Sequence, residues 1–73
     1  MKIAERLKEL RAKAGQTQVT VAKSIGVAEV SYQRYELGMH EPVPKILVAL
    51  ADHFDTSADY ILGRTDNPSP PHK

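Results

Sequence analysis

The sequence of 73 residues predicts an all-α fold of five helices around one small core. Apolar residues recur at helical spacing along most of the chain, and no stretch alternates apolar and polar residues as a half-buried strand does. Each of the four glycines follows one helical segment, at the position past a helix end where a positive φ is common. One further helix boundary, near residues 54–55, has no glycine. The four glycines are Gly15, Gly26, Gly38 and Gly63.

The first two helices are predicted from apolar stripes and a capping residue. The first is expected from Ile3 to Ala14, because its apolar residues form one stripe, with Arg6 off that stripe. The second is expected to begin after Thr17, a residue type favoured as an N-cap, and to end near Ser24. The stripe of the first helix comprises Ile3, Leu7, Leu10 and Ala14.

Three further helices complete the expected domain, which spans residues 1–63. The third is expected from Ala28 to Leu37, and the fourth after residues 42–44, whose prolines suit a first helical turn. The fifth runs from Ser57, as N-cap, to Leu62. Residues 64–73 carry Asn-Pro, Ser-Pro and Pro-Pro steps without apolar periodicity, which predicts a flexible proline-rich tail. Inward-facing residues of the fourth helix are Ile46, Leu47, Leu50, Ala51 and Phe54.

The composition excludes several classes of site. The chain has no cysteine, and none of its three histidines is four residues from another, so we expect no metal and no cofactor. No apolar run has the length of a membrane span, and the N-terminus is too mixed in charge for a signal peptide. The expected location is therefore cytoplasmic. Asp52, His53 and Asp55 would splay around a helix end, so nothing indicates an enzyme.

The net charge of +1 is unevenly distributed. Residues 1–36 contain seven Lys and Arg against four Glu, a net +3, whereas residues 37–73 carry a net −2. A basic half is a candidate nucleic-acid surface, although a short chain can also be uneven by chance.

Residues 17–37 carry the pattern that predicts function. The second and third helices are joined only by Gly26 and Val27, a turn too short for antiparallel packing. The two helices must therefore cross steeply, as in a helix-turn-helix. In that motif the second helix lies in the major groove of DNA.

The third helix has two different faces at 100° per residue, with Tyr32 and Tyr35 on the inward side. On the outward side, Arg34 can donate to guanine, Gln33 can pair with adenine, and Glu29 can accept from cytosine. Val30, on the same face, can contact a thymine methyl group. The alternative is an ordinary solvated helix surface. The predicted base-contacting residues are Glu29, Val30, Gln33 and Arg34.

The segment TQVTVAKSIGVAEVSYQRYELG resembles the Cro/repressor-type helix-turn-helix family, which includes the lambda and 434 repressors. LKELRAKAGQTQ is similar to the family's first helix, and HEPVPKILVALADHFDTSADYILG to its last two helices. The resemblance covers Ile3 to Gly63. It implies a five-helix lambda-repressor-like DNA-binding domain, with the helix-turn-helix at helices two and three. The expected partner is a double-stranded DNA operator.

The resemblance also implies roles for single residues. Gln18 matches a glutamine that contacts DNA and braces the recognition helix, and Arg11 with Glu36 matches a structural ion pair. Relatives often carry Ser or Thr where Ala28 stands, and a basic loop where this chain has residues 38–41. His40 could contact phosphate from that loop when protonated, and the alternative is an exposed loop histidine without a role. The expected phosphate or secondary contacts are Thr17, Gln18, Ser31 and His40.

Repressors of this kind usually bind palindromic operators as dimers, so a homodimeric transcriptional repressor is the leading hypothesis. The C-terminal half, with Val48 pointing outward, is the candidate dimer surface, although scattered exposed apolar residues are also normal. The alternative is an antitoxin or another protein-interaction module on the same fold. The acidic second half of the chain would suit a basic protein partner.

Overall fold

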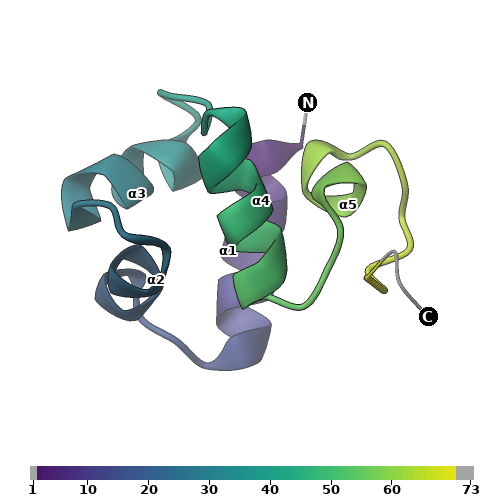
Figure 1. Ribbon diagram of the computed structural model, residues 1–73, viewed down its shortest axis with the longest axis horizontal. Helices are drawn as coiled ribbons and strands as arrows, with labels where there is room; N and C mark the ends of the chain where they lie inside the picture. The colour runs from purple at the N-terminus through teal and green to yellow at the C-terminus, as the bar shows by residue number, and fades with distance from the viewer. Residues whose placement is uncertain (1, 71–73) are drawn as a thin grey trace.

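The computed structural model describes residues 2–70, which form five α-helices and no strand (Figure 1). The predicted all-α class is confirmed. The third helix begins one residue later than predicted, with Ala28 as its N-cap, and the second extends to Ile25. The helices are α1 (Ile3–Ala14), α2 (Gln18–Ile25), α3 (Glu29–Leu37), α4 (Pro44–His53) and α5 (Ala58–Leu62).

The turn between α2 and α3 is set by Gly26, which has a φ of 78°. This left-handed conformation directs the Val27 N–H back to the Ala22 carbonyl oxygen at 3.0 Å and ends α2. A residue with a side chain would be strained at this φ. The other three glycines also end helices with positive φ, so the predicted glycine boundaries are confirmed.

Each helix contributes one completely buried side chain to a common core. These side chains come from five points spread along the sequence, so none of the helices stands apart from the core. α3 packs against α1 and α2, while α4 packs against α2 and α5. The five buried side chains are Leu7, Val21, Tyr32, Leu50 and Ile61.

The prediction that Arg6 lies off the buried face of α1 is wrong. Only 7% of Arg6 is exposed, because α5 packs against α1 on that side and places the Tyr60 ring 3.9 Å from the guanidinium carbon. Arg6 Nη2 also donates to Asp66 Oδ1 at 2.7 Å. Ala14, placed on the apolar stripe, is exposed. α1 therefore has a broader buried face than one stripe, since it has two helical partners.

Asp66 and Pro68, in the segment after α5, each contact a buried residue of the helical domain. One contact is the Arg6–Asp66 ion pair, and the other is a hydrogen bond of 2.6 Å from the buried Thr56 hydroxyl to the Pro68 carbonyl oxygen. The domain boundary at residue 63 and the flexibility of residues 64–73 stay predictions, and residues 71–73 lie outside the described part of the chain.

The arrangement leaves α2 and α3 together at one end of the molecule, with α1 and α4 in the middle and α5 at the other end (Figure 1). α3 is thus held by both α1 and α2, which pack against it. Within residues 2–70, no helix is long and apolar enough to cross a membrane.

Candidate nucleic-acid interface

α3 presents a polar, accessible face opposite its buried one. Tyr32 and Glu36 are buried against the domain. The four side chains predicted to read bases lie away from this buried side: Glu29, Val30 and Arg34 are exposed, and Gln33 is half-buried. The structure therefore places all four where DNA could reach them.

The accessible face extends one turn further than predicted. Leu37 is 70% exposed and lies seven residues after Val30 and three after Arg34, so it shares their side of α3. Leu37 is not among the four predicted base-contacting residues of α3. An apolar side chain in this position can contact sugar carbons or a thymine methyl group.

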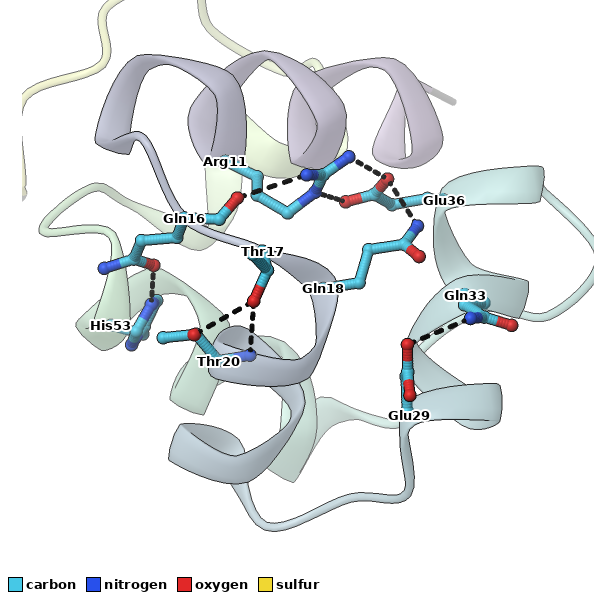
Figure 2. Close-up of polar contacts among 9 residues, drawn as sticks. All are labelled: Arg11, Gln16, Thr17, Gln18, Thr20, Glu29, Gln33, Glu36 and His53. Carbon is cyan, nitrogen blue, oxygen red and sulfur yellow. Dashed lines mark hydrogen bonds and ion pairs between the residues drawn. The ribbon is translucent and has the colours of Figure 1, made fainter.

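Glu29 and Gln33 are joined to one another by a hydrogen bond. Gln33 Nε2 donates to Glu29 Oε2 at 3.2 Å, across one turn of the helix (Figure 2). The sequence interpretation treated the two side chains as separate readers. In the free protein they form one polar unit.

The back of α3 is fixed by a network that spans three helices (Figure 2). Arg11 of α1 donates from Nε to Glu36 Oε2 at 2.7 Å and from Nη2 to Glu36 Oε1 at 3.1 Å. Gln18 of α2 donates to the same Oε1 at 3.1 Å. Arg11 Nη1 also donates to the Gln16 carbonyl oxygen at 3.2 Å. A single buried carboxylate thus ties α3 to the first turn of α2 and to α1.

The electrostatics of this network follow from burial and charge. Only 3% of Glu36 is exposed, and burial on its own raises the pKa of its carboxyl. Hydrogen bonds from Arg11 and Gln18, together with the Arg11 charge, outweigh burial and hold the Glu36 pKa below its ordinary value. The Arg11 pKa is raised, first by its hydrogen bond to Glu36. Both groups are therefore held in their charged forms.

The N-terminus of α2 is capped, whereas that of α3 lacks a side-chain cap. The Thr17 hydroxyl accepts from the Thr20 N–H at 3.2 Å and lies 3.0 Å from the Thr20 hydroxyl. Ala28 has the extended N-cap conformation but no side chain that can accept a hydrogen bond. Thr17 therefore caps the start of α2, and because it is exposed, its side chain also faces solvent beside Gln18.

His53 is a contributor that sequence reasoning missed. Its Nε2 lies 2.6 Å from Gln16 Oε1, and its Nδ1 lies 2.8 Å from the Ser24 hydroxyl (Figure 2 shows the bond to Gln16). The ring therefore joins the last residue of α4 to both ends of the α2 region. No sequence signal predicts this, because the partners are 37 and 29 residues away.

An open cavity of about 270 Å³ lies beside the C-terminal half of α3. It brings together two of the predicted phosphate contacts, Ser31 and His40, and the predicted base reader Arg34. Its other polar residues are Tyr35 and the acidic Glu41. The basic side chains in the cavity and its hydroxyl groups favour the binding of an anion, whereas the Glu41 carboxylate disfavours it. Thr17 and Gln18 lie separately, at the start of α2.

Comparison with known proteins identifies this architecture. A family model described as a helix-turn-helix domain matches residues 2–61. The DNA-binding domain of the P22 C2 repressor, solved by NMR, has the same fold, with a TM-score of 0.80 and 31% sequence identity; the match covers 85% of this chain and 82% of that one. The Cro/repressor-type resemblance is therefore confirmed.

Curated relatives agree with this result. The uncharacterized HTH-type transcriptional regulator YobD of Bacillus subtilis is 44% identical over 66 residues, which cover 90% of this chain and 59% of the relative. The cryptic phage CTXphi transcriptional repressor RstR of Vibrio cholerae is 41% identical, over 88% of this chain and 57% of the relative. The chain thus spans under three fifths of the length of these two proteins. It belongs to the helix-turn-helix domain family and has the fold of the phage repressor DNA-binding domains.

Proposed function

We propose that this chain is a sequence-specific DNA-binding domain of a transcriptional repressor, which inserts α3 into the major groove of a palindromic operator as a homodimer. The observation that carries the proposal is the bracing of α3 by the Arg11–Glu36–Gln18 network, with the polar side chains of α3 on the opposite side. Such rigidity is what base reading requires, because contacts to base edges depend on the exact placement of short hydrogen bonds.

The proposed DNA contacts divide between bases and backbone. Arg34 donates to guanine, Val30 contacts a thymine methyl group, and Glu29 with Gln33 reads a third base. Phosphate contacts come from the start of α2 and from the cavity beside α3. Arg11 and Glu36 are assigned to the fold, since their charges face one another. The proposed backbone contacts are Thr17, Gln18, Ser31 and His40.

Affinity in this arrangement depends on base contacts and on dimerisation. The loop after α3 contains Glu41 in place of a run of basic residues, so it adds little attraction for phosphate. A dimer doubles the contact area and places two recognition helices in successive major grooves, roughly 34–36 Å apart. The exposed Val48 of α4 is the proposed centre of the dimer surface. The predicted cytoplasmic location rests on this DNA target and stays a prediction.

Selection from a randomised duplex library, followed by sequencing, tests the proposal. We expect a palindromic motif whose half-site spacing gives the separation of the two recognition helices. Enrichment of a single, non-repeated half-site would contradict the dimer but keep the base-reading role of α3. A folded chain that enriches no sequence would contradict the proposal and favour a protein-interaction module.

A further inference from the structure

We propose that Glu29 is a positioning residue that fixes the orientation of the Gln33 amide, so that the pair selects a base with an amino group in the major groove, adenine or cytosine. This inference rests on the proposed function and adds to it the class of base that this part of α3 reads. It makes Glu29 a determinant of specificity through Gln33, as well as a contact in its own right.

The orientation of the amide follows from the chemistry of its partner. A carboxylate can only accept hydrogen bonds, so the side of the Gln33 amide that faces Glu29 must be its nitrogen. The two side chains are four residues apart on one helix, which is the spacing at which they meet on the surface. Nε2 lies 3.2 Å from Oε2, and Figure 2 shows the amide oxygen on the side away from Glu29. The first turn of α3 also favours the negative charge of Glu29.

An unrestrained glutamine can read any base, because its amide can rotate to present either an oxygen or an N–H group. The bond to Glu29 removes this freedom and occupies one of the two N–H groups. What remains for DNA is the amide oxygen, one N–H group and the free lone pairs of the carboxylate. Acceptors therefore dominate this part of the surface.

The major groove offers few partners for such a surface. Adenine and cytosine present amino groups at N6 and N4, whereas guanine and thymine present oxygens at O6 and O4. An oxygen-bearing base facing Glu29 and the Gln33 amide oxygen would meet two acceptors, and the one remaining Gln33 N–H would be its single donor there. Adenine adds an acceptor at N7 that can take the remaining Gln33 N–H. The two orientations of a base pair are thereby distinguished, because only one of them places the amino group on this side.

The inference also means that the two flanks of the accessible face of α3 differ in hydrogen-bonding character. Glu29 and Gln33 present acceptors on one flank, and Arg34, which can only donate, lies about 100° or more around the helix from them. Guanine is the partner that suits Arg34. Each half-site should therefore contain an adenine or cytosine read by one flank and a guanine read by the other.

The test compares base preferences of the unmodified chain and three variants, selected in parallel from the same randomised duplex library. Glu29→Gln keeps the size of the side chain but removes its acceptor-only character, so Gln33 is free to rotate. Glu41→Gln is the matched control, because it removes the same charge from the exposed loop next to α3. Gln33→Glu keeps acceptors at both positions. Circular dichroism and melting temperature verify that all four proteins are folded.

We expect the unmodified chain to prefer amino-bearing bases at one half-site position by about tenfold or more. Glu29→Gln should reduce that preference to about twofold while the guanine position stays unchanged. Glu41→Gln should keep the preference even if it binds all DNA more tightly, and Gln33→Glu should keep it with weaker binding.

The inference is wrong if Glu29→Gln selects the same motif as the unmodified chain, or if Glu41→Gln loses the preference equally. It is also wrong if Gln33→Glu turns to guanine or thymine at that position. In each of these cases a motif is still selected, so the proposed function survives. If the folded, unmodified chain selects no motif, the proposed function fails and this inference fails with it.

Discussion

Arg11 Nε donates to Glu36 Oε2 over 2.7 Å, across the interface between α1 and α3. The carboxylate is almost fully buried, while a quarter of the arginine side chain reaches solvent. A buried charge needs partners, and Gln18 also donates to the Glu36 carboxylate. The pair therefore controls how firmly α3 is held.

Replacing Arg11 with alanine should destabilise the domain by about 3 kcal/mol, because it leaves a buried carboxylate without its positively charged partner. Urea unfolding measures this loss. Lys13→Ala is the matched control: it breaks the exposed Lys13–Glu9 pair of the same helix and should cost about 0.5 kcal/mol or less. An unchanged stability with reduced operator affinity would instead make Arg11 a DNA contact.

The Glu36 carboxyl should make stability depend on pH in the acid range. Its pKa in the folded state lies below its ordinary value, so the unfolded chain binds the proton more readily. The contribution is therefore fully present above the unfolded pKa, near 4.5, and is lost as the pH falls through the folded value. Unfolding free energies measured from about pH 7 to about pH 3 should fall less steeply for Glu36→Gln than for the unmodified chain. Equal slopes would show that Glu36 does not contribute.

Arg34→Ala should weaken binding to a selected operator by about 1–3 kcal/mol more than binding to random DNA, because a guanine contact carries sequence information. Fluorescence anisotropy with both duplexes measures the difference. Lys23→Ala, which removes one exposed positive charge from α2, should weaken both complexes by similar amounts. Equal losses for Arg34→Ala on the two duplexes would reassign this side chain to phosphate.

Ala28→Ser should stabilise the domain by about 1 kcal/mol, since Ala28 already has the extended N-cap conformation and lacks only an acceptor. Thr17→Ala is the complementary change at the start of α2 and should destabilise by a similar amount, because it removes a cap that is present. Thermal unfolding of both variants gives the comparison. A serine variant no more stable than the original would mean that its hydroxyl does not reach the first-turn N–H groups.

Val48→Glu should weaken self-association, because it places a charge at the proposed centre of the dimer surface. Val48 is 54% exposed on α4, so the substitution leaves the core intact. Sedimentation equilibrium without DNA measures the change. Val19→Glu adds the same charge to an exposed position on α2 and should leave the dimer unaffected. A dimer that tolerates Val48→Glu would exclude this residue from the interface.

Most of the fold could be predicted from local sequence patterns. The limits of α1 follow from apolar spacing and Gly15, and those of α5 from Ser57 and Gly63, since each signal depends on neighbouring residues. The buried position of Arg6 could not be predicted in this way. It depends on α5 lying against α1, and Tyr60 is more than fifty residues away.

The candidate site was predictable to the same extent. The accessible residues of α3 follow from helical geometry alone, and the Arg11–Glu36 contact was implied by resemblance. The bond between Glu29 and Gln33 could have been anticipated from their spacing, which is four residues. The bonds of His53 to Gln16 and Ser24 could not, because they arise only when α4 crosses the start and end of α2.

The core built from one buried side chain of each helix has a consequence for cooperativity. No helix can detach without opening contacts made by the others, so the domain should unfold in one step. A ligand that binds only the folded state then protects every helix by the same free energy. Operator bound at α3 should therefore slow amide hydrogen exchange in α5, at the opposite end of the molecule, as much as in α3 itself.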